Sequence, residues 1–389
     1  MRFASFLSTA ADADVAADEV AEQLDRALPD ADLVVVYVTP DHRVDHGRLV
    51  ARLTLAHPDA VVVGCEGGGV LGSGLEVEGQ PGLAVLAATL PGVTLTAVHL
   101  DRHMVTSEDD LATALGPLRD VTDLVGVMVL SDPYTFDLAR FIPAASALLP
   151  AVPWFGGQAS GRPAPGPHHL IVRGQPVGGG AVCVGLSGNV AIETIVAQGC
   201  RPVGAPMFVT RCRQNLLLEL DGRPPVEVLK ELYEQLPPDD QERFREGQYL
   251  GIQMRDQTEY ARGDFVIRHV LGVPDDGVGL AVAAPLQQFQ VVQLHVRDGR
   301  TSHEDLLAHF EARSGPHPAG ALLFTCLGRG RGLYGEAHHD SRCFHDEVGE
   351  VALAGFFANG ELGPVHGTPF VHGYTSVFAL FSTPRPPTS

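Results

Sequence analysis

The sequence predicts an α/β protein made of two halves, each built around a mixed sheet. Two observations lead to this prediction: short apolar runs of strand length alternate with amphipathic helical stretches, and some strand-like runs follow one another with no helix between them. The length of 389 residues suits two domains. The 44 glycines and 29 prolines follow no collagen period and therefore predict many turns between the elements.

The first half begins with a helix over 12–28, because Val15, Val20, Leu24 and Leu28 recur on one helical face. Apolar runs predict strands at 33–38, 60–63, 83–89, 94–100 and 124–130. Helical patterns predict helices at 45–57, 107–119 and 136–149. The second of these starts with a serine and an aspartate spaced as in a capping box.

A crossing rich in proline and glycine, 153–180, leads towards the second half. Strands are expected at 170–173, 181–185, 191–197, 207–210, 216–220, 265–271, 291–297 and 322–326. Helices are expected at 225–236, 239–246 and 301–310. The turn signal Asp221-Gly222, followed by a helix, places a domain boundary near 221–226.

A weak internal repeat links the two halves. The first half has a glycine pattern after a strand that recurs at the same offsets in the second half: Gly64, Gly69, Leu71 and Gly72 against Gly355, Gly360, Leu362 and Gly363. The stretch 154–157 resembles a third copy. Internal duplication is one interpretation, and chance similarity between glycine-rich loops is the other.

Charge and composition exclude several classes of function. The 47 acidic and 27 strongly basic residues give a net charge of −20, which is unsuited to binding nucleic acid or anionic lipid. No apolar run approaches the length of a membrane span, and no signal peptide is recognisable. The six scattered cysteines do not form a disulfide scaffold. We therefore expect a cytoplasmic protein with reduced thiols.

Two segments match the nucleotide-binding pattern GxGxxG, at 67–72 and 330–335. In a dinucleotide site the last glycine opens a helix whose N-terminus holds the pyrophosphate. Neither match is followed by a helical pattern, so we interpret these glycines as turn residues. The sequence also contains no Walker A motif and no GxSxG nucleophile elbow.

One segment concentrates metal-ligand residue types. His338, His339, Cys343 and His345 could hold zinc, although their spacing fits no known pattern, and a solvated polar loop is the alternative. Covalent c-type haem is excluded because no CxxCH motif occurs. Non-covalent haem held by a single histidine stays open.

Cys326 follows a strand and precedes Gly328-Arg329, a setting that can lower the pKa of a thiol. In an enzyme it would be the nucleophile, with His372 or His366 as its base. The alternative is a small buried residue with no chemical role.

The C-terminal stretch 355–364 places polar groups beside glycine turns. Asn359 and Glu361 lie within it, and His372 and Thr375 follow shortly after. Convergent polar groups on an apolar wall are what a small polar ligand requires. A purely turn-forming role is the alternative.

Motifs spread over residues 30–380 together resemble the FIST sensory domain. The best single match is Gly355-Phe356-Phe357 followed by Gly360-Glu361-Leu362-Gly363-Pro364. Further matches are Gly199–Gly204, Val209-Thr210, Asn215, Glu219–Pro224, Phe265–Arg268, Leu271-Gly272, Val296–Asp298, Cys326-x-Gly328-Arg329 and the strand with glycine loop at 61–72. The resemblance implies a FIST N-terminal domain over 30–221 and a FIST C-terminal domain over 222–380. The helical pattern near the start predicts an N-terminal helical segment over 1–29, and the proline-rich end predicts a loose tail over 381–389.

The resemblance also implies a function. The family is regarded as an intracellular sensory module for small ligands such as amino acids, and some members are reported to bind haem. No kinase or other output pattern occurs in this chain, so a stand-alone bacterial sensor would signal to a separate protein. An enzyme, a haem-based gas sensor and a pure interaction scaffold are the alternatives.

We assign ligand roles on this basis. Glu361 and Asn359 are expected to accept hydrogen bonds from an ammonium group, and Arg329 or Arg201 to bind a carboxylate. His372 and Cys65 are further candidates.

Overall fold

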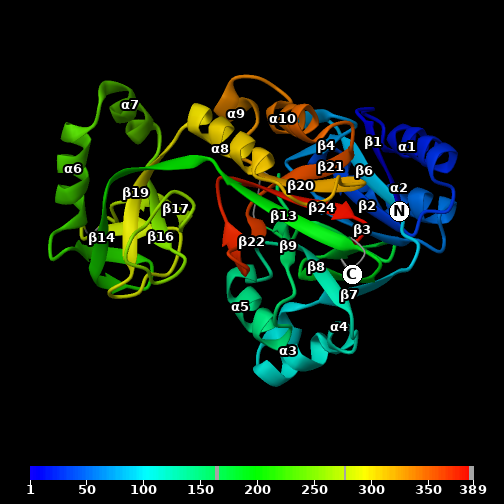
Figure 1. The fold of residues 1–389 in the computed structure, drawn as a ribbon, viewed down its shortest axis with the longest axis horizontal. Coiled ribbons are helices and arrows are strands. Elements are labelled where there is room, and N and C mark those ends of the chain that lie inside the picture. Colours follow the sequence, from blue (N-terminus) through cyan, green and yellow to red (C-terminus); the bar gives the residue numbers. More distant parts are fainter. Residues whose placement is uncertain (163–165, 276, 385–389) are drawn as a thin grey trace. The chain divides into compact units, whose positions relative to one another are not determined.

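The computed structural model describes residues 1–162, 166–275 and 277–384 (Figure 1). They divide into two compact units, and the second is an insertion in the chain of the first. Unit 1 comprises 1–197, 307–371 and the described chain from 375 onward, and unit 2 comprises 198–306 and 372–374. The boundary predicted near 221–226 from the sequence therefore falls within unit 2.

Unit 1 confirms the predicted α/β class and repeats one pattern three times: strand, helix, strand, helix, strand, hairpin, strand. The first copy comprises β1 (Arg2–Ser8), α1 (Ala13–Ala27), β2 (Leu33–Val38), α2 (His46–Ala56), β3 (Val61–Glu66), β4 (Gly69–Gly72), β5 (Leu75–Glu78) and β6 (Leu83–Thr89). A 3-10 turn, η1 (Pro40–Asp45), precedes α2.

The second copy comprises β7 (Val93–Leu100), η2 (Arg102–Val105), α3 (Glu108–Ala114), α4 (Gly116–Arg119), β8 (Leu124–Ser131), α5 (Leu138–Leu148), β9 (Trp154–Gln158), β10 (His169–Val172), β11 (Gln175–Gly178) and β12 (Ala181–Gly188). The third comprises β13 (Ala191–Gln198), α8 (Gly299–Glu311), β20 (Gly320–Cys326), α9 (Arg331–Tyr334), α10 (His339–Val348), β21 (Ala352–Ala358), β22 (Glu361–Val365), β23 (Thr368–His372) and β24 (Thr375–Ser382). The inserted unit follows β13, and its residues 299–306 form the first part of α8.

The three copies interlock by exchanging hairpins. The sheet orders are β1-β6-β2-β3-β10-β11, β23-β22-β9-β8-β12-β7 and β13-β24-β20-β21-β4-β5. Each sheet contains a parallel pair from one copy, and the hairpin beside that pair comes from another copy. The expected duplication is thus present in the topology, and the stretch 154–157 belongs to a third copy.

One glycine in each copy makes the parallel pairs possible. Gly64, Gly156 and Gly355 occupy the same position in β3, β9 and β21, opposite the neighbouring parallel strand. A Cβ atom there would lie 1.8–1.9 Å from a carbonyl oxygen of that strand. Only glycine allows so close an approach of two backbones.

The strands of unit 1 are buried on both faces, as their continuous apolar sequences predict. In β2, alternate residues face different cores: Val35 and Tyr37 join the core shared by the sheets, whereas Val34 and Val36 pack towards α1 and α2. Helices α3 and α5 cover β8 and β12 in the same way. Figure 1 shows these helices on the outer faces of the sheets.

Unit 2 is a closed β-barrel with strand order β14-β15-β18-β17-β16-β19. Its elements are β14 (Cys200–Arg213), β15 (Leu216–Leu220), α6 (Pro225–Gln235), α7 (Pro238–Glu246), β16 (Tyr249–Gln253), β17 (Phe265–Gly272), β18 (Leu280–Val282) and β19 (Val291–Arg297). Apolar residues of the strands form its interior together with Leu229 of α6 and Phe244 of α7.

Two segments differ from the sequence prediction. Residues 2–8 were expected within a helical segment but form β1, which pairs along its whole length with β6. Residues 339–348 were expected in a solvated loop but form the largely buried helix α10. Of the predicted loose tail, Phe381 and Ser382 complete β24, and 385–389 lie outside the described residues. Among the helices described, none has the length and apolar content that crossing a membrane requires.

Candidate functional site

Glu361 is a buried acid near the ends of several strands of unit 1. It opens β22, immediately after the turn that contains Asn359, and its side chain is fully buried. Its Oε2 atom accepts hydrogen bonds from the Thr375 hydroxyl at 2.7 Å and from the Thr375 backbone amide at 3.2 Å. Its Oε1 atom is buried, and no nitrogen or oxygen donor of the described residues reaches it.

Burial dominates the ionisation of this acid. It raises the pKa of Glu361 to about 8, although hydrogen bonds from Thr375, the charge of Arg329 and the thiol of Cys326 all act to lower that pKa. The carboxyl is therefore mostly protonated at neutral pH. A cation placed against Oε1 would favour the ionised form, so binding of a cation here would release a proton.

Arg329 and Asp340 form a buried ion pair beside this acid. Arg329 follows β20, and its Nε and Nη2 atoms each donate to one oxygen of Asp340 at 2.9 Å. Burial alone would raise the pKa of Asp340, but the Arg329 charge and a hydrogen bond from His339 hold that pKa well below its ordinary range. The fork of Arg329 that we expected to bind a ligand carboxylate is thus engaged by a carboxylate of the protein.

Asp340 also connects α10 to two strands. Its Oδ2 atom accepts hydrogen bonds from Thr325 of β20 at 2.9 Å and from Ser376 of β24 at 2.5 Å. On the same helix, the backbone amide of Ser341 donates to Glu76 at 2.8 Å. Burial, reinforced by the Asp340 charge, raises the pKa of Glu76 to about 7. Two buried acids with raised pKa values therefore lie close to the ion pair.

The other residues predicted to bind a ligand lie in several different elements. Asn359 is exposed in the turn before Glu361. Cys65 is fully buried in β3, within the shared core. Arg201 belongs to unit 2, where it forms ion pairs with Asp240 and Asp298, whereas the buried His372 ends β23, the neighbour of β22 in its sheet. Of the six predicted residues, the structure therefore groups Glu361, Asn359 and Arg329 in one part of unit 1.

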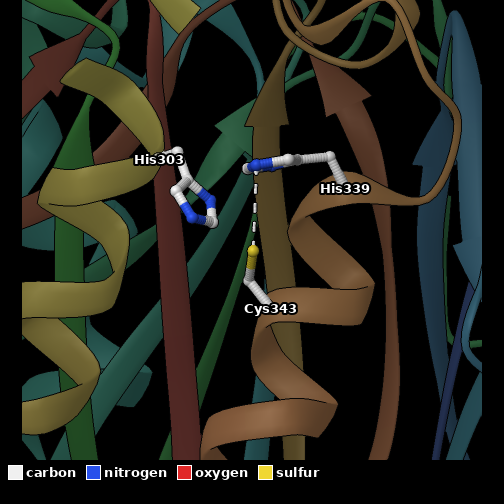
Figure 2. Close-up of side chains that lie close together, drawn as sticks. All are labelled: His303, His339 and Cys343. Atoms are coloured by element: carbon white, nitrogen blue, oxygen red, sulfur yellow. Dashed lines mark hydrogen bonds between the residues drawn. The ribbon is translucent and has the colours of Figure 1, made fainter. Parts of the chain in front are cut away.

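The histidine and cysteine segment forms helix α10 with His338 as its N-cap, rather than a loop. His339 and Cys343 are one turn apart on α10, and their Nε2 and Sγ atoms lie 3.8 Å from each other (Figure 2). The other two residues have different partners: Nδ1 of His338 accepts from the backbone amide of Glu76, and Nδ1 of His345 contacts the Gly349 carbonyl. Figure 2 also draws His303 of α8, which belongs to unit 2.

Cys326, the predicted nucleophile of an enzyme, ends β20 and is partly exposed. Its sulfur accepts a hydrogen bond from the Gly328 amide at 3.4 Å. Of the two histidines considered as its base, His366 lies in the turn between β22 and β23, and His372 ends β23. The acid next to Cys326 is Glu361, a pairing that the sequence does not indicate.

A second cluster in unit 1 was not predicted from the sequence. His46 at the start of α2, Glu66 at the end of β3 and His169 at the start of β10 direct one ligand atom each to a common point. Nδ1 of the neighbouring His168 donates a hydrogen bond to Oδ1 of Asp132 at 2.8 Å. These residues are too far apart in sequence for any spacing pattern to join them, and only the exchanged hairpin brings β10 beside β3.

Family models account for most of the chain. The FIST N domain model matches residues 32–223, and the FIST C domain model matches residues 225–364. The chain belongs to the FIST family. FIST domains are sensory-type domains, thought to bind small ligands in signalling proteins. The two model matches meet within the inserted barrel of this FIST protein, so they do not coincide with its compact units.

Relatives of this FIST protein occur in mycobacteria. A protein of Mycobacterium tuberculosis strain H37Rv, named as uncharacterized, is 34% identical over 390 residues, which is 98% of this chain and all of that protein. A second such protein, from Mycobacterium bovis, is 34% identical over 388 residues, covering 98% and 99% of the two chains. A solved structure of a cyanuric acid hydrolase from A. caulinodans aligns over 98% of this chain and 99% of that chain, at 8% identity and a TM-score of 0.37.

Proposed function

We propose that this FIST protein is a cytoplasmic sensor that binds a small ligand carrying an ammonium group, such as an amino acid, and signals to a separate protein. The observation that carries this proposal is the buried Glu361, whose Oε2 is fixed by Thr375 while Oε1 is reached by no nitrogen or oxygen donor of the described residues. An ammonium group would supply the missing hydrogen bond and the opposite charge.

The threefold repetition supports a role for Glu361 beyond folding. The residues at the corresponding hairpin position of the other two copies are Val70 and Leu170, which face Phe356 and Cys65 in the same register as Glu361 faces Gly157. Two copies of the fold thus form with an apolar side chain at this position. A buried acid costs stability and is therefore better explained by ligand binding than by packing.

Residues that neighbour Glu361 are partly exposed. Cys326 is partly exposed, Leu327 after it is 43% exposed, and Asn359 is exposed in the adjacent turn. The Leu327 amide donates to the Ala358 carbonyl at 3.0 Å, so these two turns lie side by side above the acid. We propose Asn359 as a second hydrogen-bonding group for the ligand, with Arg329 setting the charge of the site through Asp340.

The cysteines support a reducing location. None of these six described residues forms a disulfide, and four of them are buried where they could not form a bond to another chain. A cytoplasmic protein with an internal ligand and a separate output partner agrees with this thiol chemistry.

A thermal-shift screen of the purified protein tests the proposal. The probes are the standard amino acids, each compared with an analogue that lacks the amino group. A ligand at a hundred times its dissociation constant stabilises a protein by about 2.7 kcal/mol, which corresponds to a rise of roughly 5–10 °C in melting temperature. We expect a rise with one class of amine and none with its analogue.

Two variants make the screen specific to Glu361. Glu361→Gln keeps the size of the side chain and should abolish the rise, whereas Glu336→Gln removes an acid that is 52% exposed and should preserve it. If no amine stabilises the wild-type protein, or if Glu361→Gln responds as the wild type does, the proposed ligand site is wrong.

A further inference from the structure

Three potential ligand atoms from distant parts of the chain converge in unit 1, and none of them belongs to the residues proposed to bind a ligand at Glu361. The Nδ1 atoms of His46 and His169 are 3.0 Å apart, and they lie 3.6 Å and 3.4 Å respectively from Oε1 of Glu66. Glu66 is fully buried and the His46 side chain is 3% exposed, whereas that of His169 is 33% exposed. The cluster therefore lies just beneath the surface, with one histidine at its rim.

The spacing of these three atoms matches the face of a coordination tetrahedron. With metal–nitrogen and metal–oxygen bonds of 2.0–2.2 Å, two ligands of a tetrahedral zinc ion are separated by about 3.3–3.5 Å. The observed separations of 3.0, 3.4 and 3.6 Å bracket this value. An ion at the centre would contact all three atoms after shifts of only a few tenths of an ångström.

Hydrogen bonding explains this arrangement less well. If both Nδ1 atoms carried protons, the two N–H groups would face each other at 3.0 Å. If only one Nδ1 atom carried a proton, that N–H group could donate to the other Nδ1 atom or to Oε1 of Glu66, but not well to both. The lone pairs of the remaining two atoms would then face each other. A cation satisfies three converging lone pairs at once, and the single negative charge of the carboxylate favours it.

Each of the three residues is positioned by a different element of the fold. His46 begins a helix that packs on β2 and β3, Glu66 ends a parallel strand, and His169 begins the hairpin strand that pairs with β3. Beside His169, Asp132 binds both the backbone amide and the ring of His168 and so fixes the entry to β10. Such support is what a preformed metal site requires.

We propose that His46, Glu66 and His169 bind a borderline first-row divalent metal ion such as zinc through two imidazole nitrogens and one carboxylate oxygen. Two histidines and one acid are a recurring ligand set for zinc and for iron(II). Three protein ligands leave a fourth position for water or a small ligand, and the partial exposure of His169 gives access to it. This site is separate from the proposed ligand site at Glu361.

The test is metal binding by the intact protein. Protein stripped with a chelator is titrated with zinc and with cobalt(II), and bound metal is measured after gel filtration. We expect one ion per chain, with a visible cobalt spectrum typical of nitrogen and oxygen ligands and no sulfur-to-cobalt charge-transfer band. Glu66→Gln and His169→Ala should each weaken zinc binding by more than ~100-fold, because loss of a residue that only hydrogen-bonds to a metal ligand already costs about 10–100-fold.

Controls separate this cluster from other histidines. His317→Ala removes a histidine whose Nδ1 atom contacts the Pro318 carbonyl at 3.0 Å and should leave zinc binding unchanged. Cys343→Ser removes the thiol of the His339–Cys343 pair in α10 and should also leave zinc binding unchanged. Circular dichroism establishes whether each variant is folded. If a variant does not fold, the number of metal ions bound per wild-type chain still tests the proposal. Absence of bound metal, retention of binding in Glu66→Gln, or a thiolate band would each overturn the proposal.

Discussion

Arg329 and Asp340 form a bidentate ion pair with both side chains almost fully withdrawn from solvent. Each of the two hydrogen bonds measures 2.9 Å, and the side chains are 1% and 3% exposed. The same carboxylate binds hydroxyl groups of Thr325 and Ser376, so the pair joins α10 to β20 and β24. The charge of Arg329 in this pair also acts on Glu361, whose pKa it lowers.

Breaking the pair from one side should strongly destabilise the protein. Asp340→Asn leaves the Arg329 charge buried without its partner, and the loss of a single member of such a pair typically costs about 3–5 kcal/mol. Urea unfolding followed by circular dichroism measures the change. The matched control is Glu336→Gln, which breaks the exposed Arg342–Glu336 pair and should cost less than ~1 kcal/mol. Equal effects of the two changes would show that burial of the pair is not what matters.

The glycine shared by the three copies should tolerate no side chain. In Gly355→Ala, the new Cβ atom would lie 1.8 Å from the Leu323 carbonyl oxygen, so the strands must separate. We expect a loss of at least about 3 kcal/mol, the upper end of what overpacking usually costs. Gly116→Ala is the control, because no atom lies within 4 Å of its new Cβ, and it should be nearly neutral. The midpoints of urea unfolding measure the stability of both variants. A Gly355→Ala variant as stable as the wild type would contradict the close approach of β20 and β21.

The free energy of unfolding should fall as pH rises between about 4.5 and 8. The pKa of Glu361 is raised from 4.5 to about 8 in the folded protein, so over this range the folded state retains a proton that the unfolded state has lost. One such group contributes up to about 1.4 kcal/mol per pH unit. Glu76, whose pKa is raised to about 7, adds a contribution of the same sign.

Replacing Glu361 by glutamine tests this pH dependence. The difference in unfolding free energy between the wild type and Glu361→Gln should shift in favour of the variant as pH rises from 5 to 8. Chemical denaturation at several pH values measures it. A difference that stays constant over the range would mean that Glu361 is not protonated in the folded protein.

Two of the six cysteines should react quickly in the native protein. Cys212 and Cys326 are partly exposed, whereas the other four are buried. Burial raises the pKa of Cys183 to about 12 and, with help from nearby acids, that of Cys343 to about 12. A chromogenic disulfide reagent should therefore titrate two thiols rapidly at neutral pH and all six after unfolding. The variant Cys326→Ser should lower the rapid count by one, and rapid reaction of four or more thiols would contradict the packing of the sheets.

Much of the fold could be predicted from the sequence because local patterns determine it. The run 33–38 forms β2 over those same residues, and Ser107 caps α3 through the Asp110 amide as its spacing indicates. β1 was missed because its side chains alternate weakly, and pairing with β6 rather than local preference makes it a strand. Helix α10 was missed because its polar residues are buried by specific partners, as Asp340 is by Arg329.

The candidate sites were only partly predictable, for a physical reason. Glu361 could be identified because it lies within a dense local motif beside glycine turns. The ion pair between Arg329 and Asp340 could not be identified from the sequence. The residues around an arginine in the chain do not tell whether its guanidinium is available to a ligand or paired inside the protein. His46, Glu66 and His169 are brought together by the exchange of hairpins between copies, which local sequence does not encode.

The most direct test of the central claim is the number of protons released when an amine ligand binds. A carboxyl with a pKa of about 8 is about nine-tenths protonated at pH 7, and an ammonium group bound against it should displace that proton. Isothermal titration of the amino acid found in the thermal-shift screen, in two buffers of different ionisation enthalpy, measures the proton count. We predict release of close to one proton by the wild type and none by Glu361→Gln, which should bind weakly. Tight binding without proton release in both proteins would contradict the assignment of Glu361 as the ligand-binding acid.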